Sequence, residues 1–235
     1  NKQVEYGKLF LKTGVVFGLI SSLLVAFPTG DWNAKNVAKY QPAAFAAMEG
    51  IFETEHAGAE IVLIGQPNMV EKKLDNKIAV PNILSFLTYQ EWDKQIIGMD
   101  KFKEEELPDN VPALYYSYHI MVGLGTIFIG VMALAFFFLW RRKLFKSKKL
   151  LWLIMFLVPF PYIANITGWY VAELGRQPYL VYGLLKTSDG VSPTVSSGNT
   201  LFTLLGFVAL YMLLGLLFLV LVGKTINEGP NSKTH

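Results

Sequence analysis

The sequence predicts an all-α membrane protein with four transmembrane helices and a large extracytoplasmic loop between the first and the second. Of its 235 residues, 52% are hydrophobic, which is too high a share for an ordinary soluble domain of this length. About 20 apolar residues cross the core of a bilayer. Four long stretches lack Asp, Glu, Lys and Arg, namely residues 13–30, 110–140, 150–172 and 191–223.

The first transmembrane helix is predicted within residues 1–30. Its charge-free part is short and ends near Pro28, but Lys8 and Lys12 can lengthen it, because lysine side chains reach the interface while their methylene groups stay in the apolar layer. The other three helices are predicted at 113–140, 150–172 and 200–223. The connecting segments are an extracytoplasmic region at 31–112, a basic cytoplasmic loop at 141–149, an extracytoplasmic segment at 173–199 and a cytoplasmic tail at 224–235.

Charge decides the predicted orientation. The loop RRKLFKSKK at 141–149 has six basic residues and no acidic one, and short loops rich in Lys and Arg stay in the cytoplasm. Alternation of the spans then places both termini in the cytoplasm and residues 31–112 outside. That outer region carries 14 acidic residues against 8 lysines.

Composition excludes several kinds of site. The chain has no cysteine, which rules out disulfides, thiolate metal sites and iron–sulfur clusters within it. Its formal net charge of +3 is small, and we expect a lipid bilayer and no nucleic acid among its partners. No cleavable leader is expected before the first span, and the missing initiator methionine suggests a fragment.

A short helix is predicted in the outer region, over QPAAFAAMEGIFETEH at residues 41–56, which is rich in Ala, Met and Glu. Glu49 borders its apolar stripe, and a carboxylate there could accept a proton from the hydroxyl of an apolar ring substrate. A solvated Glu on a surface helix is the alternative that spacing alone favours. After Val62 the region is charged and interrupted by Pro and Gly, which predicts a solvated connector. The apolar stripe consists of Phe45, Met48 and Phe52.

The second span contains two side chains that bind metals in other proteins, His119 and Met121. Two residues apart on a helix, they point in nearly opposite directions and cannot bind the same iron. A thioether is a soft ligand of the kind found in His/Met haem sites, and Gly123 and Gly125 leave flat space nearby. Helix packing is the alternative that sequence alone favours. An aromatic belt at the outer interface precedes them, with Tyr115, Tyr116 and Tyr118.

The third span ends in GWYVAELGRQP, where two charged residues, Glu173 and Arg176, lie at its rim. Gly175 and Pro178 predict that the helix ends right after Glu173 and that the arginine lies in a loop. The guanidinium could bind a carboxylate such as a haem propionate. Pairing of the two charges with each other at the water interface is equally consistent with the sequence.

These motifs carry a family resemblance. GWYVAELGRQP followed by YGLLKTSDGVS resembles the signature of subunit I of the cytochrome bd quinol oxidases, and the segments GDW, QPAAFAAMEG and MVGLG precede it in the family's order. That subunit is roughly twice as long and has nine spans, of which this chain resembles the last four. The agreement covers most of the chain.

The resemblance implies a quinol:oxygen oxidoreductase of the bacterial cytoplasmic membrane. Quinol is oxidised at the outer face beside the so-called Q-loop, electrons pass through low-spin haem b to high-spin haem b and haem d, and oxygen is reduced to water. The reaction generates proton-motive force without pumping. The implied partners are the N-terminal half of subunit I, oxidase subunit II, a small single-span subunit, and ubiquinol or menaquinol.

The resemblance also assigns roles near the Q-loop and the second span. Met121 matches the axial ligand of the low-spin haem iron, and His119, where the family commonly has Arg, is grouped with the cofactor-binding residues. Glu49 matches the glutamate implicated in quinol oxidation. Ala44 stands where the family usually has a lysine. We expect the fragment alone to lack both turnover and competent haem binding, because the remaining haem ligands lie in the N-terminal spans.

A second set of roles falls on the GRQP motif. Glu173 matches a catalytic carboxylate and ligand at the high-spin haem iron. Arg176 and Gln177, with Pro178, match the cofactor-binding motif near the haems. Tyr179 replaces the usual tryptophan.

Two other functions remain open from sequence, an unrelated four-span transporter and an assembly subunit. A transporter requires polar residues that converge in the middle of the bilayer. In this chain the polar residues are predicted in the outer third of the membrane, which favours the oxidase.

Overall fold

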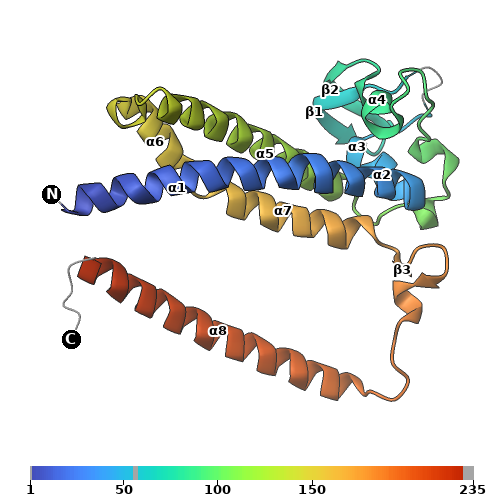
Figure 1. Cartoon of the computed structure of the whole chain (residues 1–235). Helices are drawn as coiled ribbons and strands as arrows, with labels where there is room; N and C mark the ends of the chain where they lie inside the picture. The colour runs from blue at the N-terminus through green and yellow to red at the C-terminus, as the bar shows by residue number, and fades with distance from the viewer. Residues whose placement is uncertain (1, 55–57, 230–235) are drawn as a thin grey trace. The chain divides into compact units, whose positions relative to one another are not determined.

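The computed structural model describes residues 2–54 and 58–229 of the chain (Figure 1). They divide into two compact units: the first unit is Gly7–Gly190, and the second unit contains the described residues before Gly7 and after Gly190. Among the described residues, four helical stretches are long and apolar enough to cross a membrane, which confirms the four predicted spans. These stretches are Lys2–Tyr40, Val111–Trp140, Lys148–Gly175 and Ser197–Glu228.

The first stretch is one continuous helical run and does not end at Gly30 as predicted. It consists of α1 (Lys2–Leu24), a π-helical turn (Val25–Gly30) and α2 (Asp31–Tyr40). Pro28 lies in the π-helical turn, and such a turn accommodates the missing N–H of proline within a helix. An ion pair between Asp31 and Lys35 (2.7 Å) then supports the first turns of α2.

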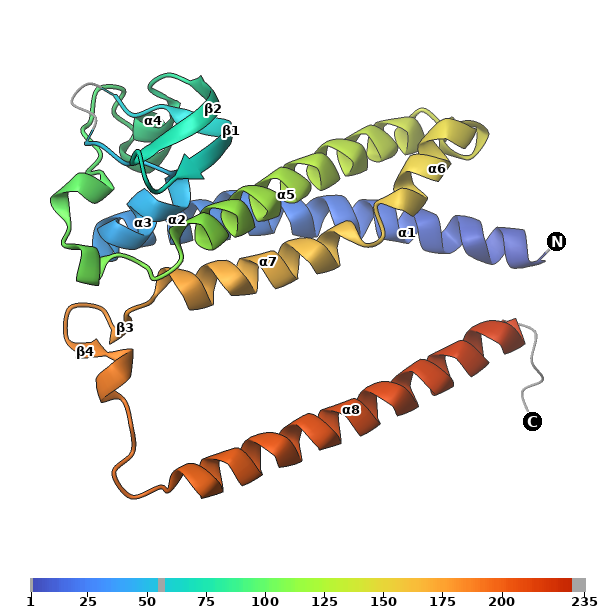
Figure 2. The same ribbon diagram turned by 180° about the vertical axis from the view of Figure 1, so that it is seen from behind.

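The second span is α5 (Val111–Trp140). Its start is determined locally, because the side chain of Asn110 accepts a hydrogen bond from the amide of Ala113 (3.0 Å) and Pro112 lies in the first turn. Figures 1 and 2 show α5 and α7 side by side from opposite directions. Three of the predicted site residues lie on these two helices, namely His119 and Met121 on α5 and Glu173 on α7.

The third span is broken into α6 (Lys148–Phe156) and α7 (Phe160–Gly175). Pro159 lies at the break and Pro161 lies in the first turn of α7. A proline has no N–H to donate to the preceding turn, but it is well tolerated at the start of a helix. The two prolines therefore account for the position of the break.

The fourth span is α8 (Ser197–Glu228), which belongs to the second unit. Its first turn is capped by the hydroxyl of Ser196, which accepts a hydrogen bond from the amide of Asn199 (3.3 Å). The helix extends the predicted 200–223 at both ends. Its sequence is apolar on every side, as expected for a helix whose whole circumference meets lipid or other membrane helices.

The short helix of the outer region is α3 (Pro42–Glu49), so the prediction of a helix over 41–56 was too long. Gly50 ends it with φ of 72°, a left-handed conformation that favours glycine. A Cβ atom at Gly50 would also lie 2.8 Å from the ring of Tyr115. Of the predicted helix, residues 55 and 56 lie outside the described residues.

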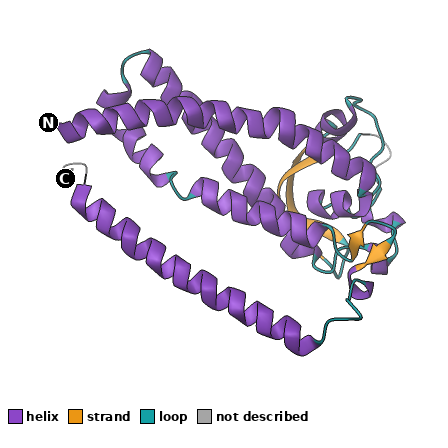
Figure 3. Cartoon of the chain, turned by 60° about the horizontal axis from the view of Figure 1, so that its bottom comes forward, coloured by secondary structure: helices purple, strands orange, loops and turns teal. Residues whose placement is uncertain are grey.

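The segment after Val62, predicted as a solvated connector, contains regular secondary structure, and the chain is mostly helical rather than purely α-helical. The connector contains an antiparallel hairpin and a short helix, and the segment after α7 contains a second, smaller hairpin (Figure 3). Charged residues in these strands suggested a connector, but one face of an antiparallel pair tolerates water. The elements are β1 (Ile61–Asn68), β2 (Lys73–Val80), α4 (Ile83–Tyr89), β3 (Tyr179–Val181) and β4 (Leu185–Lys186).

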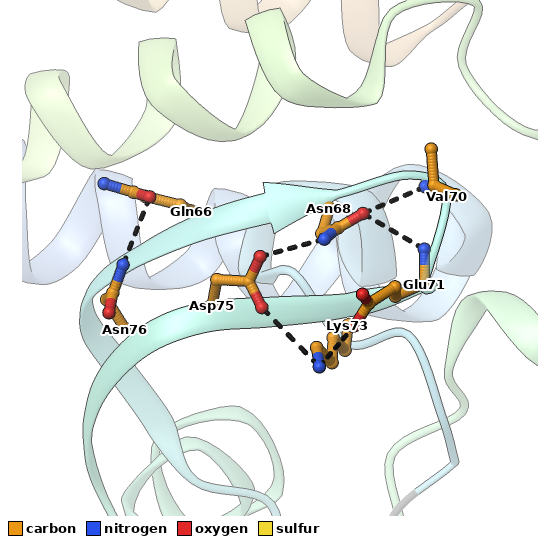
Figure 4. Close-up of polar contacts among 7 residues, drawn as sticks. All are labelled: Gln66, Asn68, Val70, Glu71, Lys73, Asp75 and Asn76. Atoms are coloured by element: carbon orange, nitrogen blue, oxygen red, sulfur yellow. Dashed lines mark hydrogen bonds and ion pairs between the residues drawn. The ribbon is translucent and has the colours of Figure 1, made fainter.

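The turn between β1 and β2 is held by Asn68 (Figure 4). Its side-chain oxygen accepts hydrogen bonds from the amides of Val70 (3.1 Å) and Glu71 (3.0 Å), and its amide nitrogen donates to Asp75 (2.9 Å). Asparagine side chains commonly stabilise turns in this way. The hairpin also carries the contacts Asn76–Gln66, Lys73–Glu71 and Lys73–Asp75.

The larger apolar cluster of the first unit surrounds α3. The small residues Ala46 and Ala47 allow α3 to approach α5 and α7 closely, and both are fully buried. Leu114 of α5 and Val171 of α7 pack into the same cluster. The last residue of α3 therefore lies where the two membrane helices meet the outer region.

Ser85 in α4 connects two other segments of the outer region through hydrogen bonds to their backbone. It is fully buried, its hydroxyl accepts a hydrogen bond from the amide of Ala59 (2.7 Å), and it donates to the carbonyl of Lys94 (2.6 Å).

Replacing Ser85 with Ala is expected to lower the local unfolding free energy of the outer region by about 1 to 3 kcal/mol, because the buried amide of Ala59 and the carbonyl of Lys94 lose their partner. Faster amide hydrogen exchange at Ala59 is the measurement. Ser188→Ala is the matched control, since that hydroxyl is exposed and contacts Asp189 (3.2 Å). Unchanged exchange at Ala59 in Ser85→Ala would contradict the prediction.

Candidate functional site

The centre of the candidate site is the carboxyl group of Glu49, the last residue of α3. Only 3% of Glu49 is exposed, and its surroundings are the apolar cluster between α3, α5 and α7. The hydroxyl of Tyr118 donates a hydrogen bond to its Oε1 atom at 2.5 Å. Glu49 is therefore buried, whereas helical spacing alone favoured a solvated glutamate on the surface of the helix.

Burial makes this carboxyl group a weaker acid than an exposed glutamate. It raises the pKa of Glu49 from 4.5 to about 7, and the hydrogen bond from Tyr118 acts in the opposite direction. A group with a pKa near neutral can accept and release a proton under physiological conditions. Glu49 is thus suited to act as a base toward a hydroxyl group.

Tyr115 lies beside Glu49 on the same face of α5 as Tyr118. Its ring packs on Gly50, and its buried hydroxyl has no hydrogen-bond partner within residues 2–54 and 58–229. The sequence analysis placed Tyr115, Tyr116 and Tyr118 together in an interfacial belt, but only Tyr116 is well exposed. A spacing of three residues on a helix was the signal that could have separated the inward pair from Tyr116.

His119 connects α5 to the outer hairpin. One ring nitrogen lies 3.0 Å from the carbonyl oxygen of Tyr115, and the other lies 3.1 Å from that of Val62 in β1. The ring also packs against Tyr115, with centroids 4.0 Å apart. A cofactor-binding role for His119 stays a prediction, and both its nitrogens are engaged by the backbone here.

Met121 lies between α5 and α7. Its sulfur faces Gly168 so closely that a Cβ atom at that position would lie 2.9 Å from it. Gly125 is one turn further along nearly the same face of α5 and has no atom within 4 Å of the place where its Cβ would be. A soft thioether beside open space fits an axial ligand of a haem iron, and the assignment of Met121 stays a prediction.

Glu173 and Arg176 lie at the end of α7, and they form an ion pair. The helix ends at Gly175, close to the predicted end, and Arg176 follows outside it. The side chain of Glu173 is 36% exposed and that of Arg176 is 47% exposed. The structure therefore contains the pairing of the two charges with each other, which was one of the two alternatives from the sequence. A role of either residue, or of Gln177, at a haem remains a prediction.

The segment after α7 folds back toward α3. Gln177 accepts a hydrogen bond from the hydroxyl of Thr187 (2.8 Å), which closes the loop. The hydroxyl of Tyr182 is hydrogen-bonded to the backbone of Ala43, and burial raises the pKa of this hydroxyl. A Cβ atom at Gly175 would lie 4.0 Å from that of Ala44. The small side chain at Ala44 thus lies at a close contact between α3 and α7.

Comparisons with known proteins give a consistent result. Residues 1–230 match the family described as cytochrome bd terminal oxidase subunit I. The chain is 34% identical to the cytochrome bd ubiquinol oxidase subunit 1 of Bacillus subtilis (strain 168), covering 100% of this chain and 52% of that protein. It is 24% identical to the cytochrome bd-II ubiquinol oxidase subunit 1 of Escherichia coli (strain K12), covering 93% and 55%.

A solved structure agrees. The bd oxidase from Geobacillus thermodenitrificans superposes with a TM-score of 0.71 and 29% identity, over 94% of this chain and 49% of that one. The chain spans about half the length of these relatives. The family match extends over nearly all of it, and with the four apolar helices it indicates a protein of the bacterial membrane. The chain belongs to the cytochrome bd terminal oxidase subunit I family.

Proposed function

We propose that the chain is the C-terminal part of the haem-bearing subunit I of a bd-type terminal oxidase, which oxidises membrane quinol at its outer face and reduces oxygen to water. The observation that carries this proposal is the buried carboxyl group of Glu49. Its pKa of about 7 suits it to take a proton from a quinol hydroxyl. The family supports a bd-type oxidase in general.

Glu49 accepts the hydroxyl proton of the quinol, and the proton leaves to the outer side. Its position in the apolar cluster between α3, α5 and α7 keeps bulk water away from the carboxyl group, and apolar surroundings suit the ring of a quinol. Haem bound by the full-length subunit would supply the electron transfer between quinol and oxygen, and two quinols with one O₂ give two quinones and two waters. The net charge separation arises without a proton pump.

Met121 would hold the low-spin haem b through its thioether, together with residues from the N-terminal half of subunit I. Glu173 would serve the high-spin haem pair, b and d. Arg176 and Gln177 would lie near the propionates, where a guanidinium pairs well with a carboxylate. In this arrangement Arg176 would bind a haem propionate in place of the carboxylate of Glu173.

The proposed orientation follows from the basic loop at 141–149, which faces the cytoplasm together with both termini of the chain. The segments 31–112 and 173–199 then face outward, and α3 with Glu49 lies in the Q-loop region. The proposed partners are the N-terminal half, oxidase subunit II, a small single-span subunit and ubiquinol or menaquinol.

The test uses the full-length subunit co-expressed with subunit II in a strain without other quinol oxidases. Membranes that contain the complex should consume oxygen when a short-chain quinol is supplied, and the reduced complex should display absorption of haems b and d. Membranes without the subunit are the control. A complex that moves a solute but neither binds haem nor consumes oxygen would favour the transporter alternative.

A further inference from the structure

We infer that Tyr118 is a positioning residue for quinol oxidation, which holds one oxygen of the Glu49 carboxyl group and leaves the other to meet the quinol hydroxyl. The inference rests on the proposed function and assigns a role to a residue that sequence motifs placed in an interfacial belt. Tyr118 lies in α5, three residues before Met121, whereas Glu49 ends α3.

The hydrogen bond joins two elements that are distant in sequence. Tyr118 donates to Oε1 of Glu49 at 2.5 Å, across 69 residues of chain. Within residues 2–54 and 58–229, this bond to Oε1 is the side-chain hydrogen bond that the structure shows for the Glu49 carboxyl group. Oε1 is therefore held in place, and the proposal assigns the other oxygen to the quinol hydroxyl.

The hydrogen bond from Tyr118 opposes the effect of burial on the ionisation of Glu49. Burial favours the neutral form of Glu49, and the donor Tyr118 favours the ionised form, which is the form that acts as a base. On α5, the ring of Tyr115 packs at Gly50, the residue after Glu49. Charged groups on the other elements packed against α3 have partners of their own: Lys39 lies over Tyr40, Asp100 binds Thr54 and Lys101, and Glu173 pairs with Arg176.

The proton transfer in this arrangement is simple. The quinol O–H bond breaks and a new O–H bond forms on the free oxygen of Glu49, while the electron pair of the broken bond stays on the quinol oxygen. The oxidant that balances the loss of electrons from the quinol would be a haem bound by the full-length complex. Tyr118 keeps its own proton throughout, so it acts through Glu49 and does not touch the reacting atoms.

Tyr118→Phe in the full-length oxidase complex tests the inference. Phenylalanine keeps the ring but removes the donor, so the ionised form of Glu49 loses support. A hydrogen bond to a charged group is strong enough to move the acidic limb of the pH–rate profile upward by about one pH unit. Quinol-dependent oxygen consumption at pH 7 should fall about five-fold, and the two profiles should approach each other at higher pH.

Tyr116→Phe is the matched control, because Tyr116 is the exposed neighbour on the same helix, and its profile should equal that of the wild type. In a Glu49→Gln background, adding Tyr118→Phe should change the residual rate by less than about two-fold, since the two residues act together. Haem absorption should be unchanged in all variants.

An unshifted acidic limb in Tyr118→Phe, with Glu49→Gln inactive, would overturn the inference and leave the proposed function intact. A rate lowered equally at every pH would also overturn it, because that is the result of a purely structural role. An inactive wild-type complex would instead refute the proposed function.

Discussion

Replacing Glu49 with Gln in the full-length complex is expected to lower quinol-dependent oxygen consumption by about 10² to 10⁴-fold, the range typical for loss of a general base. Glutamine has nearly the same shape and can still accept a hydrogen bond from Tyr118, but its amide cannot take the quinol proton. The apolar cluster around position 49 should remain packed, since the substitution also removes the cost of burying a charge.

The measurement is the steady-state rate from pH 5 to pH 9, with haem spectra recorded on the same samples. In the wild type the rate should rise as the pH increases through about 7, because the ionised carboxylate is the base. Glu49→Gln should lose this acidic limb. Glu53→Gln, at an exposed position shortly after α3, is the control and should behave as wild type. A Glu49→Gln rate within a few-fold of wild type, with an unchanged limb, would rule out this base.

Replacing Met121 with Leu is expected to abolish the absorption of the low-spin haem b. Leucine has a similar volume and should pack against Gly168 at a cost below about 1.5 kcal/mol, but it has no lone pair to give to an iron. Oxygen consumption should fall to background, because electrons from quinol would lose their entry point. The high-spin haem signals should remain.

Difference spectra of the dithionite-reduced complex, with and without carbon monoxide, separate the low-spin haem from the high-spin ones. Met132→Leu is the matched control on the same helix, where the buried thioether packs near Gly18. It should leave every haem signal in place. A normal low-spin signal in Met121→Leu would mean that another residue is the ligand.

The membrane spans were predictable because their signal is local. Each apolar run is unfavourable in water whatever the rest of the chain does. The end of α7 near Glu173 was predictable for the same reason, since Gly175 and Pro178 act on the neighbouring backbone. The predicted end of a helix was wrong where the same local residue is compatible with two backbone structures. Pro28 suggested an end, but a π-helical turn carried the helix on to Tyr40.

The hairpin of β1 and β2 was missed because strand pairing joins residues that periodicity in a single window does not relate. Its turn contains no glycine and depends on the side chain of Asn68. Its charged strand resembled a connector.

By itself, the sequence determined the membrane class, the four spans and, through its motifs, the family. It also singled out Glu49, Met121, Glu173 and Arg176 as candidates. The tertiary structure decided which of the candidates are buried and which are paired. Glu49 is buried because α3 packs on α5 and α7, and Tyr118 reaches it from 69 residues away. Burial and hydrogen bonding between distant segments control the acidity of a carboxyl group, and neither can be derived from local spacing.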